Sequence, residues 1–211
     1  MAETRKITIT EALRELKTLD NRIMKAVSEC KFIGAKKKSS DKVGNFDKDN
    51  FVTNAKAGYQ SVKDLIANRD AIKGKIVHSN AITNVEIGGK TYTVAQAIER
   101  KSSIEYEKTL LIAMKQQYKK VTDQVSKEND KVDNQINNML LTYLGKDSDK
   151  KLNENDLELI TTPYREKNEW ELVDPLNLYD EIQDLEKSIV SFEADVDTCL
   201  SISNSITFIE V

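Results

Sequence analysis

Apolar residues recur at intervals of three and four along four long stretches of this chain. This spacing places them on one face of an α-helix. It predicts helices near residues 10–30, 49–80, 94–144 and 175–205. With only 7 Gly and 2 Pro residues, the chain has few helix breakers, which favours long helices. The pattern therefore predicts an all-α protein, an elongated antiparallel helical bundle or coiled coil.

Three of the four helices have recognisable start signals. Segments 8–11 and 93–96 read Thr-x-x-Glu and Thr-x-x-Gln, the capping box in which a hydroxyl and a polar side chain satisfy free backbone N–H groups. Asp174-Pro175 offers an N-cap aspartate followed by a proline at the first helical position. These signals fix where the first, third and fourth helices should begin.

The third predicted helix carries a repeat of seven residues. A sustained heptad of apolar residues indicates left-handed supercoiling against a partner helix. The residues spaced by seven are Ala97, Ile104 and Leu111, and then Tyr118, Val125, Val132 and Met139.

Between the second and third helices the period changes from helical to alternating. Residues 85–93 alternate around Gly88-Gly89, and a Gly-Gly pair permits the positive φ angles of a two-residue turn. We therefore expect one small β-hairpin at 85–93.

The remaining segments are predicted to be connections. Residues 33–50 should form a loop, and residues 145–173 a long loop in which 157–162 and 170–173 are candidate short strands. The β-branched and aromatic end of the chain, 206–211, is a candidate strand or subunit contact. No boundary stands out, so residues 1–211 are expected to form a single elongated helical domain. Because thin helical layers bury little surface, we also expect a homo-oligomer with an even number of subunits.

Composition restricts the classes of partner and the compartment. The formal net charge is only −3 although 32% of residues are charged, which argues against a nucleic-acid partner. The short run Lys36–Lys38 fits a solvated loop, with a phosphate-binding patch as the alternative. No apolar run reaches the roughly 20 residues of a membrane span, and residues 1–9 lack a signal-peptide core. We therefore expect no membrane association and a cytoplasmic protein, in a bacterial host if the source is a phage. Cys30 and Cys199 are expected to be free thiols.

No catalytic motif is present in the sequence. It contains no G-x-S-x-G, Walker loop, H-E-x-x-H or C-x-x-C, and His78 is its only histidine. Asp123 and Asp130 lack the neighbours that a metal site needs. The chain is therefore expected not to be an enzyme and to hold no metal or cofactor.

Polar and aromatic residues are concentrated at two places outside the predicted helix centres. Arginine and lysine can bind phosphate, tyrosine and tryptophan can stack on a base, and asparagine and threonine can bind polar groups. Together they would suit an anionic, nucleotide-like molecule, although the same residues could simply cap helices and close loops. The predicted ligand-binding residues are Arg100, Lys101 and Arg165 for phosphate, Tyr92, Tyr164 and Trp170 for stacking, and Asn80 and Thr83 for polar contacts.

Several short motifs resemble the septicolysin-like family of small helical proteins from bacteria and phages. The family pattern is roughly T-N-A-x-T, then G-x-T-L-T, then A-L-A-x-R, although Ser79 and Tyr92 depart from it here. The resemblance implies long helices, a hairpin, a cyclic or dihedral oligomer and no established catalytic activity. The matching segments are Asn80-Ala81-Ile82-Thr83, Gly89-Lys90-Thr91-Tyr92-Thr93, Ala97-Ile98-Glu99-Arg100-Lys101, Ile9-Thr10-Glu11-Ala12-Leu13, Tyr164-Arg165-Glu166-Lys167 and Val173-Asp174.

Two functional hypotheses follow from these features. The Lys-, Asn- and Asp-rich, Pro-poor composition suggests a phage of a low-GC host. Phages encode small oligomers that sequester host immune signals, so the leading hypothesis is a non-catalytic protein that sequesters a nucleotide-derived, ADP-ribose-type signalling molecule. The alternative is a structural or assembly coiled-coil protein of a virion or tail.

Overall fold

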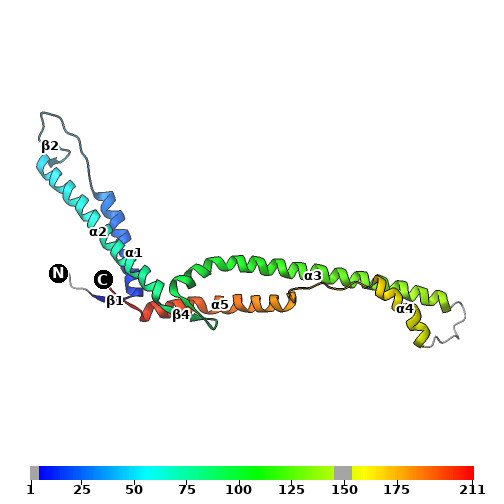
Figure 1. Ribbon diagram of the computed structural model, residues 1–211. Coiled ribbons are helices and arrows are strands. Elements are labelled where there is room, and N and C mark those ends of the chain that lie inside the picture. The colour runs from blue at the N-terminus through cyan, green and yellow to red at the C-terminus, as the bar shows by residue number, and fades with distance from the viewer. Residues whose placement is uncertain (1–4, 145–153) are drawn as a thin grey trace. The chain divides into compact units, whose positions relative to one another are not determined.

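The computed structural model describes residues 5–144 and 154–211 (Figure 1). That part of the chain is mostly α-helical, with short strands joined in two-stranded sheets, so the predicted fold class is confirmed. The helices are α1 (Ile9–Glu29), α2 (Lys48–Ile82), α3 (Val94–Leu144), α4 (Glu154–Asn168) and α5 (Leu178–Ile206). The strands are β1 (Lys6–Thr8), β2 (Lys42–Val43), β3 (Phe46–Asp47), β4 (Asn84–Ile87), β5 (Lys90–Thr93) and β6 (Phe208–Glu210).

Local capping explains where α1 and α3 begin. The Thr8 hydroxyl accepts a hydrogen bond from the Glu11 amide at 3.2 Å, and the Glu11 carboxylate accepts one from the Thr8 amide at 2.8 Å. The hydrogen bond from the Thr8 backbone amide is the main reason that the pKa of Glu11 is lowered. Thr93 and Gln96 form the same reciprocal pair, at 2.8 and 3.1 Å, before α3. Both helix starts are thus fixed by side chains three residues apart.

The last helix begins later than the Asp-Pro signal indicates. A turn and Asn177, whose φ is +51°, separate Asp174 from the start of α5 at Leu178. The Asp174 carboxylate nevertheless accepts hydrogen bonds from the amides of Leu176 at 3.3 Å and Leu178 at 2.8 Å. The aspartate therefore closes a turn that leads into the helix instead of capping a helix that starts at residue 175.

The described chain divides into two compact units. The first contains the residues up to Ser102 together with Ser191–Val211, and the second is Ser103–Val190. Helices α3 and α5 contribute to both units. The expectation of a single elongated domain stays a prediction.

In the first unit, α1 and α2 enclose a small apolar core next to the paired strands β1 and β6. Strand β6 pairs antiparallel with β1, with Lys6 opposite Glu210 and Thr8 opposite Phe208. The candidate strand at the end of the chain is therefore a strand, and its partner is β1. Arg69 on α2 binds Asp20 on α1 at 2.7 Å, and this contact raises the pKa of Arg69. The buried core consists of Ile9, Ala12, Leu16, Leu19, Ile72, Ile76 and Ile209.

The β4–β5 hairpin lies between α2 and α3 and packs against α5. Its two-residue turn is Gly88-Gly89, with φ angles of +56° and +75°. Ile87 is 1% exposed, and the Cys199 thiol of α5 donates to the Glu86 carbonyl at 3.3 Å. Gly88 touches α5 so closely that an added Cβ would lie 2.7 Å from the Ser191 hydroxyl.

In the second unit, α3 runs antiparallel to α4 and to the first part of α5. Moving forward along α3, Lys115 binds Glu186 at 2.6 Å, and Gln135 accepts a hydrogen bond from Tyr164. The seven-residue repeat lies in this seam, where Ile104 and Val132 are buried. Toward the C-terminal end of α3 the apolar side chains are less buried, and Met139 is 40% exposed.

The prediction of a loop over 145–173 is wrong for its described second half. Residues 145–153 lie outside the described residues, but 154–168 form α4 and the candidate strand 157–162 is helical. Pro163 lies inside α4, although proline in a helix interior costs about 3 kcal/mol. Packing of α4 on α3 outweighs that local penalty. Residues 170–173 form no strand, because the Trp170 backbone is hydrogen-bonded by the Asn129 side chain and not by a strand.

The prediction of an irregular loop over 33–50 also needs correction. Strands β2 and β3 form a small hairpin, with Val43 opposite Phe46, and α2 already begins at Lys48. The turn is Gly44-Asn45, and Gly44 has a φ of +59°. A Gly-Asn pair between two apolar residues is a hairpin signal that the high lysine content of this segment obscured.

Replacing three glycines with alanine tests the hairpin packing. Gly88→Ala should lower the free energy of unfolding most, because it adds a contact with Ser191 to the cost of positive φ, which alone is about 1–3 kcal/mol. Gly89→Ala should show only the backbone cost, since nothing lies within 4 Å of its added Cβ. Gly74→Ala, inside α2 in open space, should stabilise by up to about 1 kcal/mol. Urea unfolding measures all three, and equal losses at Gly88 and Gly89 would contradict the packing against α5.

Candidate functional site

The predicted ligand-binding residues are divided between the two units. The second unit holds Tyr164, Arg165 and Trp170 on or just after α4. The first unit holds Asn80 and Thr83 at the end of α2, Tyr92 on β5, and Arg100 and Lys101 on α3. That the two sets share one binding site stays a prediction, and each set is described by itself.

In the first unit, Arg100 lies against two aromatic rings. Its guanidinium carbon is 5.0 Å from the centre of the Phe192 ring and 5.9 Å from that of Tyr92. The two rings meet edge to face at 5.7 Å. A cation over ring faces is attracted by their negative quadrupole. This cluster joins β5, α3 and α5, and it is the densest aromatic and cationic group among the predicted residues.

Lys101 is the more accessible cation beside this cluster. Its amine binds the Asp197 carboxylate of α5 at 2.5 Å, while 44% of the lysine side chain and 77% of the aspartate side chain are exposed. An ion pair this exposed contributes little to stability. A phosphate could therefore displace Asp197 at low cost, but it would have to compete with that carboxylate.

Thr83 has a structural role in the described fold. Its amide donates to the Ser79 carbonyl at 2.9 Å, and its own carbonyl accepts from the Val94 amide at 2.9 Å. It thus closes the end of α2 and ties that end to the start of α3. Asn80, half-buried in the last turn of α2, lies one turn before this junction. The contacts of Thr83 fit the alternative in which the residue closes the end of a helix and binds no ligand.

In the second unit, two of the predicted side chains bind α3. Arg165 contacts the Asp133 carboxylate at 2.5 Å and that of Glu169 at 3.6 Å. The Tyr164 hydroxyl donates to Gln135. These contacts hold α4 on α3, so Arg165 could bind a phosphate only by exchanging its carboxylate partners.

Trp170 differs from its neighbours because the residue is 47% exposed although its backbone is held by two hydrogen bonds. The Asn129 side chain donates to the Trp170 carbonyl at 2.9 Å and accepts from its amide at 2.8 Å. The Asn129 side chain thus makes the two backbone hydrogen bonds that a neighbouring strand would make in a sheet. The indole ring is therefore held at the surface, where it could stack on a ligand or on another protein.

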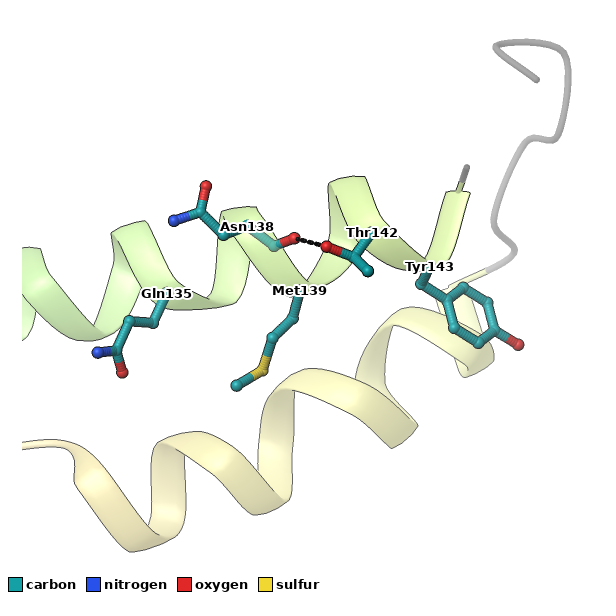
Figure 2. Close-up of a pocket in the computed structure, with 5 residues that line it drawn as sticks. All are labelled: Gln135, Asn138, Met139, Thr142 and Tyr143. Atoms are coloured by element: carbon teal, nitrogen blue, oxygen red, sulfur yellow. Dashed lines mark hydrogen bonds between the residues drawn. The ribbon is translucent and has the colours of Figure 1, made fainter. Parts of the chain in front are cut away.

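Two hollows are lined by none of the predicted residues. The larger, about 850 Å³, opens along the end of α3 and is lined by Gln135, Asn138, Met139, Thr142 and Tyr143, with Gln135 and Met139 turned toward α4 (Figure 2). The smaller, about 290 Å³, lies where the end of α1 meets β3 and α2, and Phe46 and Phe51 line it with Cys30 and Lys31. Sequence reasoning missed both because their walls come from segments it treated as solvated helix or loop.

Within residues 5–144 and 154–211, no three His, Cys, Asp or Glu side chains gather in a way that could hold a metal ion. None of the helices described there is long and apolar enough to cross a membrane.

Comparison with protein-family models, with curated proteins and with solved structures found no match to this chain. The resemblance to the septicolysin-like family therefore stays a prediction.

The aromatic contacts of Arg100 can be tested by a change that keeps its charge. Arg100→Lys loses the flat guanidinium that lies on the two rings, so the free energy of unfolding should fall by about 0.5–2 kcal/mol. Lys101→Arg, at the neighbouring exposed position, is the matched control and should stay within about 0.5 kcal/mol of the parent. Chemical unfolding followed by circular dichroism measures both. If Arg100→Lys were as stable as the parent, the stacking would have no energetic role.

Proposed function

We propose that this protein is a non-catalytic, self-associating helical protein whose main role is assembly. The observation that carries the proposal is the imbalance between buried and exposed apolar side chains in the second unit. More large apolar side chains of this unit are exposed than buried, for example Tyr106 at 80%, Leu159 at 74% and Val173 at 82%. The buried apolar residues of the described part of this unit are Ile104, Val132, Ile136, Ile182 and Ile189.

This imbalance has a direct energetic consequence. A layer made of one helix against another can bury one narrow seam, and the remaining apolar side chains stay in water. Covering a fully exposed leucine or isoleucine contributes about 1.5–3 kcal/mol. A second copy of the same chain is the partner always present at the right concentration, so homo-oligomers are the common solution.

The absence of catalytic motifs in the sequence supports the non-catalytic part of this proposal. The only histidine, His78, is exposed on α2, and no nucleophile–base motif accompanies it in the sequence. A self-associating helical protein needs no such group. A structural component of a larger assembly, such as a virion or tail, is the biological setting that this proposal fits.

A second candidate function is the sequestration of a nucleotide-derived anion. The specific observation in its favour is the cluster of Arg100, Tyr92 and Phe192 beside the accessible Lys101. Aromatic faces suit a base and neighbouring cations suit phosphates. A sequestering protein is also expected to be oligomeric, so both candidates share the assembly and differ in whether a small molecule is bound.

The assembly proposal predicts a mass well above that of one chain. Light scattering at micromolar concentration should give a multiple of 23.9 kDa, and we expect an even multiple. Replacing the exposed Tyr106 and Leu110 of α3 with serine should leave the helical circular-dichroism signal unchanged and shift the measured mass toward that of the single chain. A parent mass near 23.9 kDa across the micromolar range would contradict the proposal.

The sequestration candidate predicts a bound molecule that heat releases. Protein purified from its expression host would be denatured, and the supernatant examined for nucleotides by mass spectrometry. Arg100→Ala and Arg165→Ala should each weaken binding of the released molecule about ten- to a hundredfold, because each removes a charge-assisted hydrogen bond to phosphate. Arg69→Ala removes an ion-paired arginine that binds Asp20 and serves as the matched control. Release of no small molecule, with an intact oligomer, would leave assembly alone as the function.

A further inference from the structure

Charge is distributed very unevenly along the chain, although the total is close to zero. Residues 22–63, the end of α1, the connecting segment and the first half of α2, contain ten Lys and Arg residues and four Asp and Glu residues. Helix α5, Leu178–Ile206, contains seven Asp and Glu residues and a single Lys. Two segments of one chain therefore carry net charges of +6 and −6, which the overall value of −3 conceals.

The basic segment also exposes apolar side chains. Ile33 is 89% exposed, Met24 72% and Tyr59 57%. Beside them lies the hollow of about 290 Å³ walled by Phe46 and Phe51. We call this surface the basic face, defined by residues 22–63. Exposed apolar residues and a small hollow with aromatic walls, in a segment rich in lysine, have the composition of a docking surface, in which apolar anchor side chains are accompanied by charged contacts.

Helix α5 has two acidic flanks, and only one of them is used by α3. Glu186 binds Lys115 and Asp197 binds Lys101, both on α3. On the other flank, Asp184 and Asp195 are eleven residues apart, which is three helical turns, so they share a face. Both are exposed, and Ile202, a further seven residues along, is 56% exposed on the same face. We call this surface the acidic face, defined by Asp184, Asp195 and Ile202.

Within the first unit, residues 191–206 of α5 leave the basic face uncovered. Within the first unit, α5 shares a hollow with residues 10–17 of α1, through Asp197 and Leu200 on α5 and Arg14 and Lys17 on α1. That contact lies at the opposite end of α1 from residues 22–29. The basic face keeps its exposed apolar residues after this contact is made.

We propose that the basic face binds the acidic face of a second copy of this chain. This inference rests on the self-association proposed above and assigns its interface. The lysines of the connecting segment, Lys36–Lys38, would meet Asp184 and Asp195, while Ile202 approaches the apolar side chains between the lysines. The two faces carry opposite charges, so every copy offers a matching surface to the next, and these charges steer the encounter.

A second copy explains the composition of the basic face better than a nucleic acid does. Glu29, Asp41, Asp47 and Asp49 are interspersed among its lysines, and a phosphate backbone would be repelled by them. The exposed apolar residues have no role on a phosphate backbone but are covered by a protein surface such as the acidic face. Because the two surfaces differ, the contact is either made twice in a reciprocal pair about a two-fold axis or made head to tail, which builds a ring or an open filament.

Cross-linking with isotope labels tests the contact directly. Equal amounts of unlabelled and ¹⁵N-labelled full-length protein would be mixed, treated with a carbodiimide that joins amines to carboxylates without a spacer, and digested for mass spectrometry. We expect linked peptides that join Lys36–Lys38 of one label to Asp184 or Asp195 of the other. Links that only ever join peptides of the same label would place the contact within one chain and overturn the inference.

Charge reversal supplies the quantitative test. Lys37→Glu with Lys38→Glu should weaken self-association about tenfold or more in sedimentation analysis, because two attractions become repulsions. The control, Lys119→Glu with Lys120→Glu, makes the same charge change at exposed positions of α3 and should have little effect. Mixing the first variant with Asp184→Lys/Asp195→Lys protein should restore association, which a simple folding defect could not do. Raising the salt from about 0.1 to 1 M shortens the Debye length from roughly 10 to 3 Å and should weaken the parent oligomer.

The outcomes separate this inference from the proposed function. If the parent is a single chain in solution, self-association fails and the inference fails with it. If the parent is oligomeric but the Lys37/Lys38 variant associates as tightly as the control, assembly stands and this interface is wrong. If the parent binds a short duplex DNA or anionic vesicles through Lys37 and Lys38 while its oligomer is unaffected by their reversal, the basic face serves another partner and the inference is overturned.

Discussion

The narrow seam along α3 is the constraint on which the second unit depends. A helix that packs on one neighbour can bury one stripe, and the seven-residue repeat supplies it, with Ile104 and Val132 at its buried positions. Polar contacts then fix the register of the antiparallel partner, through Lys115 with Glu186 and Gln135 with Tyr164. Because the seam uses so little of the apolar surface, the rest must stay in water or be covered by another chain. The proposed assembly follows from this geometry.

The parts of the fold that sequence reasoning predicted are those that local chemistry decides. The starts of α1 and α3 depend on side chains three residues away, and the hairpin turn depends on two adjacent glycines. Helix α4 was missed because its evidence is not local. Pro163 and the polar residues around it argue against a helix, and only the contacts with α3, some 30 residues earlier in the chain, make the helix favourable.

The same distinction applies to the candidate site. Residue type alone indicated that Arg100, Arg165 and Tyr92 could bind an anion or a base. It could not show that Asp133 would bind Arg165 or that Phe192 would lie under Arg100, since these partners are 32 and 92 residues away in sequence. The partners matter because a cation that already binds a carboxylate is available to a ligand only by exchange. Lys101, whose pair with Asp197 is exposed, exchanges most easily.

Charge balance within a chain and charge balance between surfaces are separate properties. A net charge of −3 gave no indication of a docking surface, yet residues 22–63 and α5 carry opposite charges of equal size. Inside the second unit and at the start of α3, lysines of α3 already neutralise one flank of α5. The other flank and the basic face are left with charges that favour association between copies and disfavour stacking of like surfaces. A chain with so small a core can specify one mode of assembly in this way, because opposite charges set which surfaces meet and the exposed apolar residues supply the affinity once they have met.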